Sequence, residues 1–166
     1  MSGEHGSTDR NDIARVWRLM DDIDVCMLAS RDGERIRARP MAAIPRRDAH
    51  AIYFLSSIEG HKDQEIAEDD HVCLTFARPG DGKFLVVTGR ARVRNDRALI
   101  RELWNDRVAA WWEGPDDPRV RVIEVTPEDA QFWEGPHGIA GTIAMVTAAA
   151  TAGPPALGDQ RKVDLQ

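Results

Sequence analysis

This sequence of 166 residues has no net positive charge, only two cysteines and no glycine-rich motif, and each of these shortages excludes a class of protein. The net charge of −6 argues against a general nucleic-acid-binding surface, which needs a basic field. The two cysteines, Cys26 and Cys73, lie inside apolar runs without the spacing of metal ligands, so we expect buried reduced thiols and no bound metal. The glycine-rich phosphate loops of nucleotide-binding folds are missing, as is any Ser–His–Asp order that would predict a nucleophile.

Long apolar segments are also absent. The polar start of the chain, MSGEHGSTDRND, lacks the apolar core of a signal peptide. The longest mostly apolar stretch, GIAGTIAMVTAAATAG, is shorter than the ~20 apolar residues that a membrane-spanning helix needs. These observations predict a cytoplasmic protein that binds neither membranes nor nucleic acid.

An apolar content of 42% suffices for one hydrophobic core, and the length favours one domain. We expect that domain to span residues 9–152, between a disordered N-terminus (1–8) and a polar C-terminal tail (153–166). Helical spacing of apolar residues predicts an amphipathic helix ending near Asp22 and another over 96–104, with Asp96 as its N-cap. A polar surface helix over 60–70 and an alanine-rich helix after Gly138 are also expected.

Six segments have the short apolar or alternating pattern of strands: 23–30, 35–44, 51–55, 71–77, 84–94 and 120–125. Asp32-Gly33 is a hairpin turn signal between the first two, Pro40 indicates a bulge or an unpaired edge, and Gly89 indicates a bulge in the fifth. Alternating strand–helix units of a parallel sheet are absent. The pattern therefore predicts a mainly β (α+β) protein, a six-stranded antiparallel split β-barrel with flanking helices.

Arg39 and Lys62 carry the main site hypothesis. An arginine fork and a mobile lysine both suit a phosphate, and Lys62 lies where a helix begins, so free backbone N–H groups would add partial positive charge. Ser56 and Ser57 end a strand and could donate hydroxyls to an anion. The alternatives are that the basic strand is simply a solvated face, that the serines form turn hydrogen bonds and that His61 only caps the helix.

The tryptophans divide into two groups. Trp17 and Trp104 lie on apolar helical faces and are expected in the core. Trp111 and Trp112 are adjacent on a Gly/Pro-rich loop, so we expect one of them to face a cavity or a partner chain.

Several motifs occur in an order that is typical of one family: Arg39-Pro40-Met41, YFLSS, GHKDQEI, FLVVTGRARVRND, LWNDRVAAWWEGPDDPRV and QFWEG. Over about residues 10–135 the chain resembles the pyridoxamine 5′-phosphate oxidase-like split-barrel flavoproteins, and among them the general stress protein branch. This resemblance implies a homodimer with two FMN sites at the subunit interface.

The resemblance also implies roles for individual residues. Arg39, with Met41 in the same motif, and Ser56 would contact the flavin or its phosphate, while Lys62 and the adjacent His61 would hold the phosphate. Two further residues would reach the flavin of the partner chain: Phe84, at the place of a glutamine in the oxidases, and Trp133, which matches a tryptophan that packs near the flavin.

Two departures from the family pattern matter for function. Gly60 stands where many relatives carry a phosphate-binding serine, and the segment after Trp133, PHGIAGTIAM, lacks the arginines that grip pyridoxal phosphate in the true oxidases. We therefore expect an FMN-binding protein, either a flavin-dependent oxidoreductase or a stress-related protein, that does not oxidise pyridoxamine phosphate. The alternatives are a non-enzymatic flavin storage or sensing protein and a deazaflavin-binding relative.

Overall fold

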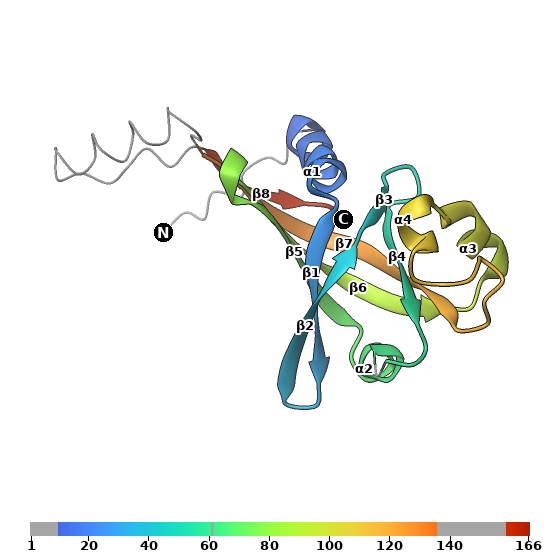
Figure 1. The fold of residues 1–166 in the computed structure, drawn as a ribbon. Coiled ribbons are helices and arrows are strands. Elements are labelled where there is room, and N and C mark those ends of the chain that lie inside the picture. The colour runs from blue at the N-terminus through green and yellow to red at the C-terminus, as the bar shows by residue number, and fades with distance from the viewer. Residues whose placement is uncertain (1–9, 61, 136–158) are drawn as a thin grey trace, which may run out of the picture.

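The computed structural model of the chain describes residues 10–60, 62–135 and 159–166 (Figure 1). Four expectations concern residues outside these ranges: the disordered N-terminus, the position of His61, the helix after Gly138 and the segment PHGIAGTIAM. The division into a domain over 9–152 and two flanking segments stays a prediction.

Eight strands form one antiparallel sheet: β1 (Val25–Asp32), β2 (Arg35–Ala42), β3 (Ile44–Arg46), β4 (Ala51–Ser57), β5 (His71–Arg78), β6 (Lys83–Arg94), β7 (Val120–Glu134) and β8 (Asp159–Asp164). The order along the sheet is β2-β1-β5-β6-β7-β4-β3, and β8 pairs with β7. Within the described residues the sheet ends at β2 and β3, which are not hydrogen-bonded to each other, so the barrel stays open between β2 and the β3–β4 pair. The predicted mainly β, antiparallel split barrel with flanking helices is confirmed.

Each of the six predicted strands is present, and two more are added. The predicted strand over 35–44 is divided, because β2 ends at Ala42 and β3 begins at Ile44 to pair with β4. β2 lies at an edge of the sheet, where the missing N–H of Pro40 removes no ladder bond.

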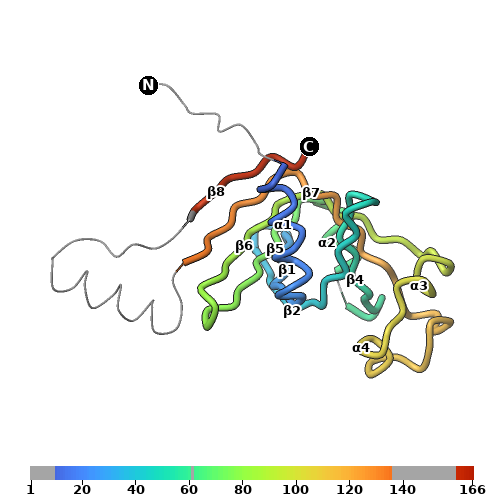
Figure 2. The backbone as a smooth tube through the Cα atoms, turned by 90° about the horizontal axis from the view of Figure 1, so that it is seen from above, coloured from blue at the N-terminus to red at the C-terminus, as the bar shows by residue number. Residues whose placement is uncertain are grey.

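The C-terminal segment contains a strand that the sequence did not predict. Residues 159–164, expected within a polar tail, form β8 beside the second half of β7 (Figure 2). β7 pairs with β4 only as far as Val125, so its edge beyond that point needs a new partner. Val163 and Leu165 are buried there, and a pattern of only two apolar residues is too short to predict a strand.

The glycine predictions hold at both positions. Gly33, in the turn from β1 to β2, has φ of +60°, a conformation that favours glycine. At Gly89 the register between β6 and β7 shifts, and a Cβ atom there would lie 2.3 Å from the Thr126 carbonyl oxygen. The predicted bulge is therefore present, and it admits no side chain at Gly89.

Helices cover the two ends of the barrel (Figure 1). α1 (Arg10–Ile23) buries its apolar face, including Trp17, against the barrel core, and it ends where Asp24 takes a φ of +60°. α2 (Lys62–Glu68) was predicted as a surface helix, but Glu65 and Ile66 are buried. The correction follows from tertiary contact, because α2 lies against β1 and β6.

A second hydrophobic cluster lies on the outer side of β4. The long connection from β6 to β7 contains α3 (Arg97–Leu103) and α4 (Asp106–Ala109), which pack on Tyr53 and Leu55. The Asp96 carboxylate accepts a hydrogen bond from the Leu99 N–H at 3.0 Å, which confirms the predicted cap. Trp104 is partly buried against this cluster.

The cysteines differ from each other. Cys26 is buried as predicted, and burial raises the pKa of its thiol to about 12. Cys73 is only half-buried, because alternation along β5 turns it away from the core. Both thiols are free.

Candidate functional site

A cavity of about 900 Å³ lies at the opening between β2 and β4. Its walls come from both edges of the split barrel, from the start of α2 and from the loop that follows α4. The residues that line it include Pro40, Met41, Ala42, Ile44, Arg46, Ser56, Ser57, Lys62, Arg107, Trp111 and Trp112. Three of the predicted cofactor contacts, Met41, Ser56 and Lys62, are thus brought into one cavity.

Ser56 is a polar group without a partner inside the protein. Its side chain is only 2% exposed, and its Oγ forms no hydrogen bond with any described residue. A buried hydroxyl left unpaired costs free energy, so such a group at a cavity wall indicates a missing ligand. The alternative of simple turn chemistry applies instead to Ser57, whose Oγ accepts a hydrogen bond from the Glu59 N–H at 3.1 Å.

Lys62 supplies a cation to the same cavity that Ser56 lines. No described carboxylate lies within ion-pair distance of its ammonium group, and burial, followed by the nearby Arg39 charge, lowers its pKa. A Cβ atom added at Gly60 would lie 3.6 Å from the Lys62 Nζ, so the lysine folds back over the glycine. A bound anion would relieve the cost of this partly buried, unpaired charge.

Arg39 is already occupied. Its guanidinium donates to the Glu65 carboxylate at 2.6 Å and to the Ser30 hydroxyl at 2.8 Å, and Ser30 in turn donates to Glu65 at 2.6 Å. Glu65 is 5% exposed. Burial raises the pKa of Glu65, but the hydrogen bonds from Ser30 and Arg39, with the Arg39 charge, outweigh burial and hold the pKa below its ordinary value. The solvated-strand alternative therefore fails for Arg39, which joins β2 to α2.

A second, more polar cavity of about 740 Å³ adjoins the first at Lys62. Arg39, Gly60 and Gln64 are among its lining residues. Lys62 is the one predicted site residue that borders both cavities, so an anion beside it would lie at their junction.

Phe84 and Trp133 form a separate pair. They are opposite each other on β6 and β7, and neither lines either cavity. Phe84 is 39% exposed and Trp133 is half-buried, both on the side of the sheet that faces away from the core. A single chain thus places these two residues away from the Met41–Ser56–Lys62 cavity.

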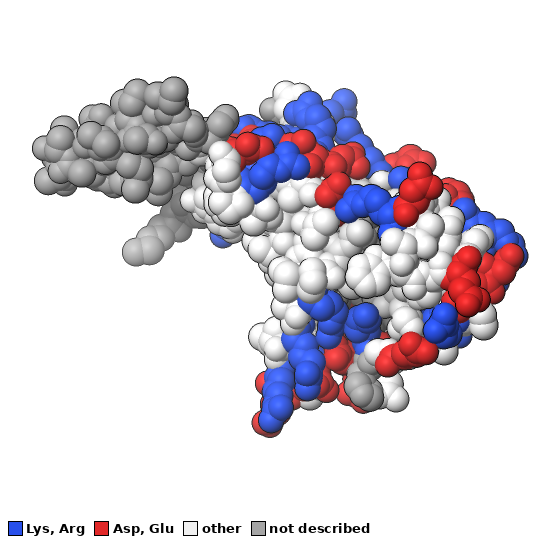
Figure 3. All heavy atoms as spheres, in the orientation of Figure 1, with Lys and Arg blue, Asp and Glu red and all other residues white. Residues whose placement is uncertain are grey.

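That outer side of the sheet is mostly uncharged over five strands, with Asp129 beside Thr88 at its border. We call it the outer face, and it consists of Ala38, Pro40, Ala42, Val25, Met27, Ala29, Cys73, Thr75, Ala77, Phe84, Val86, Thr88, Gln131 and Trp133. Figure 3 shows a broad uncharged area over β1, β5 and β6 with charged residues around it. Val25 and Met27 on β1 and Phe84 on β6 are each about two-fifths exposed, which is unusual for large apolar side chains on one face of a sheet.

The sequence did not predict Arg46 as a lining residue of the larger cavity, whereas one of Trp111 and Trp112 was expected to face a cavity or a partner chain. Arg46 was read as part of a turn, although its place in a strand pattern after Pro45 could have signalled an inward-facing cation. Trp111 is 79% exposed and Trp112 is half-buried, and both line the cavity. Glu65, the partner of Arg39, carried no sequence signal, since the pair is separated by 26 positions.

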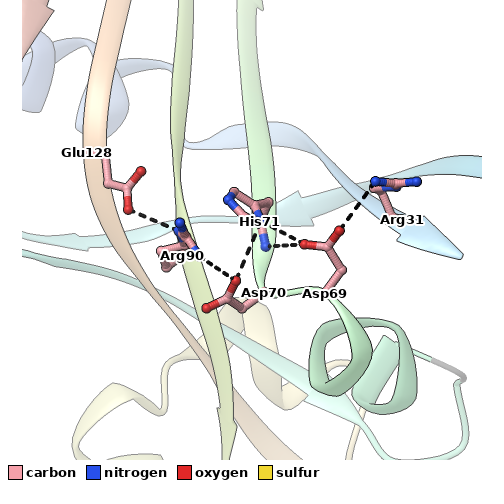
Figure 4. A network of polar contacts seen from close by, with 6 residues as sticks. All are labelled: Arg31, Asp69, Asp70, His71, Arg90 and Glu128. Atoms are coloured by element: carbon pink, nitrogen blue, oxygen red, sulfur yellow. Dashed lines mark hydrogen bonds and ion pairs between the residues drawn. The ribbon is translucent and has the colours of Figure 1, made fainter. Parts of the chain in front are cut away.

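A polar network outside the cavities joins the end of α2 to neighbouring strands (Figure 4). Its members are Arg31, Asp69, Asp70, His71, Arg90 and Glu128. The Asp69 carboxylate lies 2.8 Å from the His71 ring, whose hydrogen bond lowers the pKa of Asp69. Because Arg90 also pairs with Asp70 at 2.9 Å, the acidic groups are already compensated, and we assign the network to strand joining.

Comparison with known proteins places these features in a family. The pyridoxamine 5′-phosphate oxidase like family model matches residues 11–155. General stress protein 26 of Bacillus subtilis (strain 168) is 33% identical over 88 residues, which cover 51% of this chain and 63% of that protein. The match thus spans less than two thirds of that relative.

Solved structures agree in fold. A candidate general stress protein 26 from Jannaschia sp. CCS1 superimposes with a TM-score of 0.73 at 24% identity, covering 94% of this chain and 99% of the other. The general stress FMN/FAD binding protein of Xanthomonas citri gives a TM-score of 0.67 at 28% identity, covering 75% and 89%. No helix among the described residues is long and apolar enough to cross a membrane.

Proposed function

This chain belongs to the pyridoxamine 5′-phosphate oxidase-like family, and on that premise we propose that it binds FMN in the cavity between β2 and β4. The observation that carries the proposal is that an unsatisfied, buried Ser56 hydroxyl and a Lys62 ammonium without a carboxylate partner line the same cavity. The naming of the Xanthomonas citri relative as an FMN/FAD binding protein supports it.

The residues present fit a phosphorylated flavin. Lys62 would hold the phosphate as a point charge, the Ser56 hydroxyl would donate to a cofactor oxygen, and Met41 with Pro40 and Ala42 would contact the apolar ring. A bound flavin would supply hydride or electron transfer, while the chain supplies placement and electrostatics. Arg39 would act indirectly, because its contacts with Glu65 and Ser30 fix α2 and therefore Lys62.

The proposed site is shared between two copies of the chain. Across the outer face the strand order runs from β2, beside the cavity, to β7, which carries Trp133. A two-fold axis near the central strand β5 would bring the β7 end of one copy against the β2 end of the other. The partner subunit's Trp133 and Phe84 would then lie beside Pro40 and Ala42 at the cavity mouth, which supports the homodimer implied by the family resemblance.

The proposed activity is that of a flavin-dependent oxidoreductase or stress-related flavoprotein with an unassigned electron donor. Oxidation of pyridoxamine 5′-phosphate is not proposed, because the sequence after Trp133, PHGIAGTIAM, contains no arginine for a second phosphate. Peroxide production from that substrate at a rate typical of enzymes would contradict this.

Titration of the purified protein with FMN, riboflavin and a deazaflavin cofactor tests the proposed ligand. Flavin fluorescence quenching should give FMN an affinity roughly tenfold or more above that of riboflavin, because a hydrogen bond to a charged group contributes ~1.5–3 kcal/mol. Equal affinities for FMN and riboflavin, or binding of the deazaflavin alone, would contradict it.

Sedimentation velocity tests the shared site. The wild-type chain should sediment as a dimer that added FMN stabilises, and Met27→Asp should dissociate it by placing charge at the centre of the outer face. Ile58→Asp is the matched control, because Ile58 is 43% exposed, against 42% for Met27, and lies outside the outer face. A monomer that binds FMN at full affinity would remove the partner subunit from the site.

A further inference from the structure

We propose that Asp63 is a positioning residue for the cofactor: its carboxyl group, when protonated, donates a hydrogen bond to the Ser56 hydroxyl and directs the proton of that hydroxyl toward a bound flavin. Asp63 lines neither cavity, so it acts only through Ser56. This role rests on the proposed function, because it needs a flavin in the cavity that Ser56 lines. The coupling of the two side chains is a property of the flavin-free protein.

Two buried side-chain oxygens have no hydrogen-bond partner among the described residues, and they are the Ser56 Oγ and the Asp63 Oδ1. A hydroxyl donates one hydrogen bond and can also accept, so a cofactor oxygen that takes the Ser56 proton leaves the acceptor side of this hydroxyl unpaired. A protonated carboxyl group is a donor that fits this acceptor. One contact would therefore satisfy both buried groups, each of which costs free energy while it is unpaired.

The fold turns both side chains toward the core of the barrel. Ser56 follows the buried Phe54 by two positions on β4, so alternation along the strand directs both residues to the same side. Asp63 precedes the buried Ile66 by three positions on α2, so these two residues share a face of the helix. Because Phe54 and Ile66 belong to the same core cluster, Ser56 and Asp63 both lie at its margin, one on a strand and the other on a helix.

Arg121 is a neighbour of both residues. It is the register partner of Ser56 on β7, so the two side chains leave the sheet on the same side. Its charge also acts on Asp63, although no ion pair within 4 Å joins the two residues. The Arg121 guanidinium instead donates to the carbonyl oxygens of Pro118 at 2.7 Å and Val120 at 2.9 Å. The Asp63 carboxyl group is therefore left open to the Ser56 hydroxyl.

Burial favours the protonated form of Asp63. It raises the pKa of this carboxyl group, and the charges of Arg121 and Lys62, which act on Asp63 in the opposite direction, do not offset it. The polar groups that α2 meets on β1 and β2 already bind Glu65, on another face of the helix. An ionised Asp63 would accept the Ser56 proton and withdraw it from the cofactor, so the direction of the hydroxyl depends on the protonation state of Asp63.

A carbon-13 NMR titration of the flavin-free protein tests the coupling, with the Asp63 carboxyl signal assigned by its loss in Asp63→Asn. Ser56→Ala should lower the pKa of Asp63, because it removes the acceptor of a hydrogen bond that only the protonated form donates. Ser57→Ala is the matched control and should leave this pKa unchanged, since the Ser57 Oγ is bound to the Glu59 N–H. A raised or unchanged pKa in Ser56→Ala would overturn the inference.

The pH dependence of riboflavin binding tests the positioning role without the titration of a phosphate. The wild-type affinity should fall as pH rises through the pKa of Asp63, because the bound state needs the protonated form. Asp63→Asn keeps a donor at every pH, so above that pKa it should bind riboflavin up to about tenfold more tightly than wild type, the size of one net hydrogen bond. Asp48→Asn, the same change at an exposed turn residue, should keep the wild-type profile.

The two measurements separate this inference from the proposed function. If wild type binds neither FMN nor riboflavin, the proposed function fails, and the carboxyl titration still decides whether Asp63 and Ser56 are coupled. If FMN binds but Asp63→Asn retains the wild-type pH dependence for riboflavin, the proposed function stands and the positioning role of Asp63 is wrong.

Discussion

Arg39 and Lys62 border the same polar cavity, yet the fold treats the two cations differently. Arg39 is held by Glu65 and Ser30 at 2.6 and 2.8 Å, whereas Lys62 has no carboxylate partner among the described residues. Removal of one partner from a buried ion pair is strongly destabilising, and an unpaired, partly buried cation costs free energy until a ligand binds. The contrast is the basis for the proposal that Lys62 binds the cofactor phosphate while Arg39 holds α2 in place.

Arg39→Ala should have the largest effect on the free energy of unfolding, and it tests the structural role of Arg39. It leaves the Glu65 carboxylate buried without its charge partner, which costs about 3 kcal/mol of unfolding free energy by the usual range for broken buried pairs. Urea unfolding measures this. Arg37→Ala, two positions along β2, removes an exposed pair with Asp32 and should cost below about 1 kcal/mol. Equal losses for the two variants would show that Arg39 is an ordinary surface residue.

Acid should weaken the same contact. Because the pKa of Glu65 lies below its unfolded value, its ionised form stabilises the fold at neutral pH, and this contribution is lost as pH falls from the ordinary Glu pKa through the folded one. Chemical unfolding at pH 7 and at acidic pH should show a smaller acid-induced loss in Glu65→Gln than in wild type. Glu68→Gln, an exposed neighbour on α2, should keep the wild-type pH dependence. An unchanged profile in Glu65→Gln would remove Glu65 from the network.

Gly60→Ser should have the smallest effect of these variants, and it tests whether Lys62 binds the cofactor phosphate. A Cβ at Gly60 meets the flexible end of Lys62 at 3.4 Å, an ordinary contact, so the substitution can be accommodated. The added hydroxyl would lie near the proposed phosphate and should tighten FMN by up to about tenfold, as one net hydrogen bond of ~0.5–1.5 kcal/mol allows. Isothermal titration with FMN and riboflavin checks it. A parallel gain for riboflavin would place the phosphate elsewhere.

Local patterns predicted most of the fold. Alternation placed the six main strands, and the turn at Gly33, the bulge at Gly89 and the cap at Asp96 each follow from the chemistry of one or two neighbouring residues. β8 could not be predicted, because only Val163 and Leu165 are apolar and the strand depends on the free edge of β7.

The candidate site was predictable only in part. The order of the family motifs predicted Met41, Ser56 and Lys62 as cofactor contacts, and all three line one cavity. The sequence could name Arg39 as a cation but not show that Glu65 already neutralises it, because ion pairing between distant positions depends on tertiary geometry. For the same reason Arg46 was not expected at the cavity, whereas one of Trp111 and Trp112 was expected to face a cavity or a partner chain. The roles in cofactor binding stay predictions for all of the candidate residues: Arg39, Met41, Ser56, His61, Lys62, Phe84 and Trp133.

The most direct test of the central claim, that Lys62 is the free cation for a cofactor phosphate, is the binding of FMN and riboflavin to Lys62→Ala, with Lys83→Ala as control for loss of a lysine whose charge is already paired with Asp22. The account predicts that Lys62→Ala weakens FMN roughly tenfold to a hundredfold and leaves riboflavin within about twofold. Equal losses for FMN and riboflavin in Lys62→Ala, or an unchanged FMN affinity, would contradict it.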